Sequence, residues 1–349
     1  TIDDPSAHFQ VDLYTGTGSS LANTFDGTSA MQPDLVWIKE RNAAADHALY
    51  DSTRGVQKQL ESNTTTAETT ESTGLTAFGS DGFTVGALAQ VNTSSDTYVA
   101  WGWKANGGTT SSNTDGDLTT TVQVNSTAKF SIFTYTGIDP IEPLDLGHGL
   151  GAVPEFWFIK SRSISGKNWG LYHKDMAATP QNNYIRINST NGVAAASTWW
   201  RNEAPTSLII KTGEQDDLNR ANATFVGYAW IGVQGFSKFG KYEGNGNADG
   251  TFVYCGFKPA FVMTKSVDST SDWNMFDHKR EGYNVDNDTL EANDSAAEST
   301  TDMVDLLSNG FKLRIGTDPN VAETYIYAAF AEHPFVTSTD TNSIPTTAQ

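Results

Sequence analysis

The stretch PDLVWIKERN, from Pro33 to Asn42, has two counterparts elsewhere in the chain. The same plan returns as PEFWFIKSRS from Pro154 and as PAFVMTKSVD from Pro259, about 105 to 120 residues apart. Each copy has a proline, an apolar run and a lysine. Proline fixes its own φ and lacks a backbone N–H, so it suits the start of a strand rather than its interior. The motif therefore predicts one strand per copy, beginning just after the proline.

Apolar residues occupy both faces of each predicted strand. One face carries Leu35, Trp37, Phe156, Phe158, Phe261 and Met263. The other face carries Val36, Ile38, Trp157, Ile159, Val262 and Thr264. A strand that is apolar on both faces is central and buried between two layers. We expect Lys39, Lys160 and Lys265 to mark the point where each strand leaves the core.

The similarity extends well beyond the proline motif. Upstream lie FQVDLYTG, FSIFTYTG and FSKFGKYEG, and downstream lie HALYDSTRG, WGLYHKDM and WNMFDHKR. Further on come LESN, IRIN and LEAN, and the copies close with TYVAWGW, TFVGYAW and TYIYAAF. The first and third copies also share the pairs Ala67-Glu68 and Ala297-Glu298. A period of this length describes a domain rather than one turn of a solenoid.

Each copy holds several short apolar runs separated by Gly, Asn, Ser and Asp, which is typical of antiparallel β-sheets. The predicted fold is all-β, with three tandem homologous antiparallel β-sandwich domains of jelly-roll type. The expected boundaries are residues 1–105 for repeat 1, 118–233 for repeat 2 and 234–336 for repeat 3. Residues 106–117 are expected to form a flexible linker or an exposed loop, and residues 337–349 a polar C-terminal tail.

The charge balance limits the partners that the chain can have. With 41 acidic and 22 basic residues, the formal net charge is −19. An acidic surface repels phosphate backbones and anionic lipids, so we expect neither nucleic-acid binding nor membrane insertion. The single cysteine, Cys255, lies in the apolar run FVYCGF and is expected to be a small buried residue, with a reactive thiol as the alternative.

Several stretches resemble a repeated domain of bacteriophage virion proteins, common in marine and cyanobacterial phages. They are YTGTG, HGLGAVPEFWFIK, NWGLYHK, LLSNGFKLR and TYIYAAFAEHPF, together with the long run from Gly235 to Lys265. The likeness spans Phe9 to Phe335 and is weakest in the first copy, which lacks the HGLG turn. Proteins with this domain are described as tail-fibre or other structural proteins. The resemblance implies a component of the virion surface, and it brings no catalytic residues.

The sequence lacks the common motifs of enzymes and metal sites. The chain has no G-x-S-x-G, P-loop, HExxH or C-x-x-C motif, and its six histidines lack a metal-binding spacing. We therefore predict no catalytic residues, no metal and no cofactor, and expect the histidines at turns and edges. The pattern D-x-x-R occurs at Asp51/Arg54 and Asp277/Arg280, whereas repeat 2 has His173 and Met176. A salt bridge that pins a turn is the favoured interpretation, and a binding or catalytic carboxylate is the alternative.

Two acidic features could support other chemistry. Glycoside hydrolysis needs two carboxylates about 5 to 10 Å apart. The unremarkable candidates are Asp216, Asp217, Asp302 and Asp305, which we expect to be solvated surface groups. The loop EGNGNADGT, from Glu243, resembles a calcium loop but contains too few acids, so a β-turn is the expected structure.

Trp199 and Trp200 are the candidate surface-binding residues. They are adjacent in the polar setting ASTWWRNEAPTS, where alternation of a strand would place the two rings on opposite faces. One ring is expected to point inward. The other is expected either to pack in a core or between subunits, or to stay exposed as a platform for a pyranose ring.

Together these observations predict a virion structural protein rather than an enzyme. The favoured role is a tail fibre or appendage on the phage particle surface that attaches to a host-cell glycan or protein. Partners would be other virion proteins and further copies of the chain, expected as a trimer from fibre biology. The alternatives are a capsid decoration or head-fibre protein and a polysaccharide-degrading tailspike.

Overall fold

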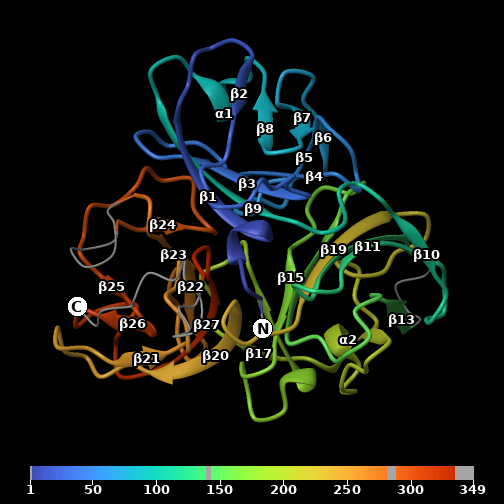
Figure 1. The fold of residues 1–349 in the computed structure, drawn as a ribbon. Helices are drawn as coiled ribbons and strands as arrows, with labels where there is room; N and C mark the ends of the chain where they lie inside the picture. Colours follow the sequence, from blue (N-terminus) through green and yellow to red (C-terminus); the bar gives the residue numbers. More distant parts are fainter. Residues whose placement is uncertain (1, 139–142, 281–287, 335–349) are drawn as a thin grey trace.

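The computed structural model describes residues 2–138, 143–280 and 288–334 of the chain. Strands dominate it, and all ladders between its named strands are antiparallel, which confirms the predicted all-β class. The described helices are single turns, namely η1 (Pro5–Ala7), α1 (Ala89–Asn92), η2 (Pro180–Asn182) and α2 (Ser197–Trp200). Figure 1 shows three lobes around a common centre, each formed mainly by one repeat.

Repeat 1 has a large sheet, a small sheet and a two-stranded ribbon. The large sheet has the order β1 (Phe9–Thr15), β9 (Thr97–Trp103), β3 (Leu35–Glu40) and β4 (Ala48–Asp51). The small sheet has the order β2 (Leu21–Asn23), β8 (Gly82–Val85) and β7 (Leu75–Gly79). The ribbon pairs β5 (Lys58–Gln59) with β6 (Thr69–Thr70).

Repeat 3 has the same plan. Its large sheet has the order β20 (Ser237–Glu243), β27 (Thr324–Phe330), β22 (Phe261–Ser266), β23 (Asn274–Asp277) and β24 (Leu290–Glu291). Its small sheet has the order β21 (Phe252–Tyr254), β26 (Gly310–Leu313) and β25 (Val304–Leu307).

Repeat 2 keeps this strand order and extends it. The part that it shares with repeat 3 is β12 (Phe130–Thr136), β19 (Thr224–Trp230), β14 (Phe156–Ser161), β15 (Gly170–His173) and β16 (Asn183–Arg186), and β17 (Ala194–Ala195) is added beyond β16. On the other side of β12 the sheet continues through β11 (Thr120–Asn125) to β10 (Ser111–Asn113). The small sheet pairs β13 (Leu144–Gly147) with β18 (Ile209–Thr212).

The three proline motifs form central strands, as predicted. β3, β14 and β22 each lie between the last strand of their repeat and the strand that follows the motif, and all their residues are buried. The expected place of the lysines is wrong, however. Lys39, Lys160 and Lys265 are fully buried instead of marking the exit from the core. Their ammonium groups donate to backbone carbonyl groups, which makes burial tolerable.

Residues 106–117 are mostly exposed, in keeping with a surface loop, but hydrogen bonds to neighbouring segments hold them in place. The Asp34 carboxylate accepts hydrogen bonds from the N–H groups of Ala105, Gly107 and Gly108, and β10 pairs with β11. The predicted tail at residues 337–349 lies outside the described residues.

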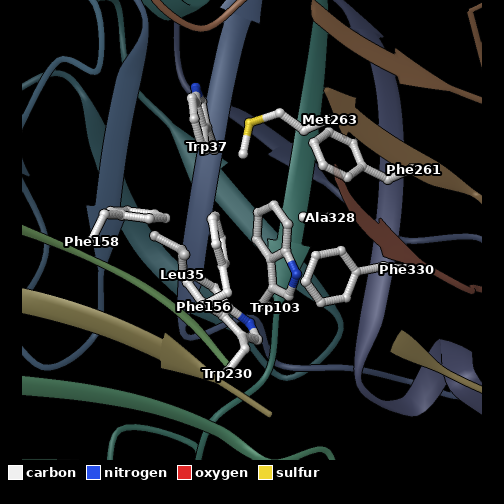
Figure 2. A pocket seen from close by; sticks show the side chains of 10 residues that line it. All are labelled: Leu35, Trp37, Trp103, Phe156, Phe158, Trp230, Phe261, Met263, Ala328 and Phe330. Carbon is white, nitrogen blue, oxygen red and sulfur yellow. The ribbon is translucent and has the colours of Figure 1, made fainter. Parts of the chain in front are cut away.

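The inner faces of the three large sheets share one hydrophobic core. Equivalent residues meet there, because Leu35 pairs with Trp103, Phe156 with Trp230, and Phe261 with Phe330 in matching registers. Figure 2 shows these six side chains converging on the centre of the molecule. The outer faces of the large sheets in repeats 1 and 3 form separate clusters with their small sheets. The division into three tandem domains stays a prediction, since the repeats share a topology and also a core.

The rings at the centre leave only a small gap. The cavity has a volume of about 10 Å³, and the residues lining it are apolar or aromatic. A buried water needs two to four polar partners, which this lining does not provide. The gap is therefore a feature of packing and not a ligand site.

Candidate functional site

The tryptophan pair does not form an exposed platform. Trp199 and Trp200 are each 1% exposed, so the candidate surface-binding site is wrong, and the alternative of packing in a core is confirmed. The Trp199 ring stacks on Tyr184 at 4.4 Å between centroids, and Trp200 meets Trp157 edge-on at 5.3 Å. The reason is local structure. The pair lies in the helical turn α2, where consecutive side chains diverge by about 100° rather than by the half-turn of a strand.

The D-x-x-R motifs lie at interfaces between repeats. In repeat 1, the Arg54 guanidinium binds Asp51 and also Glu68, with 3.0 Å between Nη1 and Oε2. Glu68 in turn binds Arg162 of repeat 2, with 2.8 Å between Oε2 and Nε. The Tyr228 hydroxyl of repeat 2 donates to Asp51 Oδ2 at 2.6 Å. These residues define the 1/2 interface.

The same network recurs between repeats 3 and 1. Arg280 Nε binds Asp277 Oδ2 at 2.7 Å, and Arg280 Nη1 binds Glu298 Oε2 at 2.8 Å. Glu298 then binds Arg41 of repeat 1 at 2.8 Å, and Trp101 of repeat 1 donates its Nε1–H to Asp277. Burial alone would raise the pKa of Asp277, but the Arg280 guanidinium holds it below its ordinary value. These residues define the 3/1 interface.

The third interface has the same backbone contact with different side chains. The backbone N–H of Val193 in repeat 2 donates to the Val267 carbonyl of repeat 3. The equivalent backbone bonds at the other two interfaces run from Glu68 to the Arg162 carbonyl and from Glu298 to the Arg41 carbonyl. His173 takes the place of the aspartates. Its Nδ1 accepts the Asp175 N–H, so its Nε2–H donates to the Tyr327 carbonyl of repeat 3 at 3.1 Å. These residues define the 2/3 interface.

A second set of equivalent contacts crosses the interfaces. Trp169 of repeat 2 donates its indole N–H to the Glu61 carbonyl of repeat 1, and Trp273 of repeat 3 donates to the Arg186 carbonyl of repeat 2. His47 of repeat 1 contacts the Glu291 carbonyl of repeat 3 through Nε2. Each repeat thus reaches its neighbour in one rotational sense. Head-to-tail contacts of this kind generate a ring when the rotation closes, and here it closes after three repeats.

Burial lowers the pKa of the lysine and histidine side chains near the interfaces. Burial lowers the pKa of Lys39, Lys160 and Lys265 to about 8. It lowers the pKa of His47 and His173 to about 3. His47, His148, His173 and His278 lie at strand ends or in the turn beside one, as expected, but all four are buried. Their burial could not be predicted from the sequence, because all four histidines bind groups that are distant along the chain.

The acidic candidates are spread over several contacts. Asp216 binds Lys167, Asp217 accepts the Asn168 N–H, and Asp305 binds Arg314, while Asp302 is exposed. Asp217 and Asp305 are buried, so the expectation of solvated surface groups holds only in part. In the loop after Glu243, the side-chain oxygens of Asn245 and Asn247 each accept the backbone N–H two residues further on, which is the pattern of an Asx-turn.

The two remaining candidate chemistries, metal binding and a reactive thiol, find no support among the described residues. Within residues 2–138, 143–280 and 288–334, no group of three or more His, Cys, Asp or Glu side chains is arranged to hold a metal ion. Cys255 is buried, and burial raises the pKa of its thiol to about 12. The thiol therefore stays protonated, in agreement with the prediction of a small buried residue. None of the described helices is long and apolar enough to cross a bilayer.

The fold and the interfaces together describe a protein of three β-repeats arranged in a ring. Its buried polar side chains act as cross-links that close three sandwich-like repeats into a ring within one chain. The chain belongs to the family described as a domain of unknown function, DUF7483, whose model matches residues 4–334 and thus all three repeats. Searches of the curated proteins and of the solved structures gave no match.

Proposed function

We propose that this chain is a structural protein of a bacteriophage particle, displayed as a tail fibre or related appendage that attaches the particle to its host. The proposal starts from the resemblance of its repeats to those of virion proteins. The closed ring of interfaces is the observation that supports it best. Two buried ion networks, and backbone and histidine hydrogen bonds at the third interface, fix the three repeats relative to one another. The outer loops are therefore carried on a rigid mount.

A rigid mount suits adhesion. Attachment through several weak sites gains strength only when the geometry allows the sites to engage together. Flexible joints between repeats would lower that gain by spreading the sites over many relative positions. The net charge of −19 also keeps such particles from associating through their surfaces. Assembly of further copies into a trimer remains a prediction, which native mass measurement addresses.

The direct test is the place of the protein in purified particles. Antibodies raised against the chain should label tails in electron micrographs, and the purified chain should compete with particles for adsorption to host cells. Labelling of the capsid at high copy number would favour the head-decoration alternative. Release of reducing sugar from host envelope polysaccharide by the purified chain would favour a tailspike. Absence of the protein from purified particles would end the proposal.

A further inference from the structure

Strand β21 presents two aromatic rings to solvent. Phe252 is 44% exposed and Tyr254 is 59% exposed, whereas Val253 between them packs into the core of repeat 3. Successive side chains of a strand alternate between faces, so the two rings lie on the same outer face. The other large hydrophobic side chains that are exposed among the described residues are all aliphatic. Exposed rings are informative because most aromatic side chains of the described chain are buried.

Charged groups flank the two rings. Phe252 lies opposite Lys312 on β26, whose ammonium group binds the Asp249 carboxylate at 2.5 Å. The Lys238 ammonium lies 5.2 Å from the centroid of the Tyr254 ring. The outer face thus combines apolar rings with ammonium donors and a carboxylate acceptor. A purely apolar partner would leave these charges without water and without a new partner, which is unfavourable.

The edge of β21 is less suited to binding. β21 is the outer strand of its sheet. The hydrogen bonds of Thr251 with Leu313 and of Cys255 with Asn309 direct the backbone groups of Phe252 and Tyr254 away from that sheet. However, Lys238 Nζ donates to the Tyr254 carbonyl at 2.6 Å. Lys238 lies on β20, and its ammonium group occupies a carbonyl that a further strand would need, which hinders strand addition. The side-chain face is therefore the better surface for a ligand.

The small sheet of repeat 1 shows that the fold does not need these rings. Asn23 corresponds to Val253, because each lies against the first glycine of the neighbouring strand. A Cβ atom placed on Gly82 would lie 2.1 Å from the Asn23 carbonyl oxygen, and one placed on Gly310 would lie 2.0 Å from that of Val253. Ala22 and Thr24 therefore occupy the positions of Phe252 and Tyr254. In repeat 2, the residue opposite Lys211 is Asp145, where repeat 3 has Phe252 opposite Lys312. The rings are a feature of repeat 3 alone.

We infer that the outer face of β21 and β26 is a carbohydrate-binding platform, with Phe252 and Tyr254 stacking on the C–H faces of hexose units. Lys238 and Lys312 donate hydrogen bonds to ring hydroxyls, and Asp249 accepts them. Flat rings beside a few well-placed polar groups are what an amphipathic sugar surface requires. The inference deepens the proposed function, because it names the host-surface polysaccharide as the ligand class and repeat 3 as its carrier.

The test compares the full chain with the variant F252A/Y254A on an array of purified bacterial capsular and O-antigen polysaccharides. Wild type should bind at least one polysaccharide, and the double variant should bind it about tenfold more weakly because both stacking surfaces are lost. The matched control is Leu208→Ala, which removes an exposed aliphatic side chain of repeat 2 and should bind as wild type. Because these side chains are exposed, thermal unfolding should be nearly unchanged in both variants.

Three results would overturn the platform. One is wild-type binding to no polysaccharide on the array, and another is undiminished binding by F252A/Y254A. The third is a smaller oligomer in the double variant with glycan binding unaltered, which would make the face a contact between copies. The proposed function fails or stands separately. A double variant that still blocks adsorption would refute the platform alone, whereas ring-dependent glycan binding by a protein absent from particles would refute only the virion role.

Discussion

The 1/2 and 2/3 interfaces are built on the same backbone contact, yet one is charged and the other is mainly apolar. At the 1/2 interface, Glu68 lies between Arg54 and Arg162. At the 2/3 interface, Val193 and Val267 pack against the central core, and Met176 stands where the arginine would be. The ring closes in both ways. The interface geometry thus comes from the paired strands and the core, and the ion network is one of two side-chain solutions for filling it.

The comparison also explains why the substituted residues differ together. Asp51 and Asp277 accept hydrogen bonds from Tyr228 and Trp101, which are donors at equivalent positions of the next repeat. In repeat 3 that position is Ala328, which has no side-chain donor. The corresponding residue in repeat 2 is His173, whose Nε2–H donates to a backbone carbonyl instead. A buried polar group is retained only where its partner is present.

The largest effect should follow from removing one member of an ion network. In Arg54→Met, the carboxylates of Asp51 and Glu68 lose the guanidinium that neutralises them in a buried setting. We expect the free energy of unfolding at pH 7 to fall by about 3–5 kcal/mol. Urea unfolding followed by tryptophan fluorescence measures it. Met176→Leu at the 2/3 interface is the matched control and should cost less than about 1.5 kcal/mol.

A block exchange sharpens the same comparison. The variant D51H/R54M/E68V/R162V gives four positions of the 1/2 interface the residues found at the 2/3 interface and keeps Tyr228. Replacing a whole buried ion network by apolar residues is often close to neutral, whereas removing one partner is costly. The fourfold variant should therefore be more stable than R54M by at least about 1 kcal/mol. Equal or lower stability would show that the two interfaces differ in backbone geometry as well.

An intermediate effect should appear in mild acid at the 2/3 interface. Burial lowers the pKa of His173 from 6.5 to about 3, so between these values the unfolded chain binds a proton that the folded chain does not. Stability from this group is complete above pH 6.5 and declines as the pH falls, by about 2 kcal/mol at pH 5. His173→Gln should remove this part of the slope between pH 7 and pH 5. An unchanged slope would place His173 outside the titration.

The smallest effect concerns the buried lysines. The pKa of Lys160 is lowered from 10.5 to about 8, so between these values the unfolded chain again binds the extra proton. Stability from this group therefore rises with pH, by about 1 kcal/mol between pH 8 and pH 9. Lys160→Met removes that gain, so its stability relative to wild type should fall over this interval. Urea midpoints at the two pH values measure the change, and a constant difference would contradict it.

The exposed face of repeat 3 shows the limit of reading single residue types. Tryptophans attract attention as binding residues, but Trp199 and Trp200 are buried by a helical turn that breaks the assumed alternation. The exposed rings are Phe252 and Tyr254 in FVYCGF, where apolar residues run without a break. Nothing in that run tells which residues face outward. Similarly, the repeated pairs Ala67-Glu68 and Ala297-Glu298 were visible, but their partners Arg162 and Arg41 lie in other repeats.

The local plan of each repeat can be predicted from its amino-acid pattern. Apolar runs on both faces, each introduced by a proline, specify a buried central strand, and their threefold recurrence specifies one topology written three times. The tertiary structure decided how the copies meet. The partners of Glu68 and His173 depend on which residues the neighbouring repeat places against them, and no spacing along the chain carries that information. Burial and charge neutralisation arise from contacts between residues tens to hundreds of positions apart.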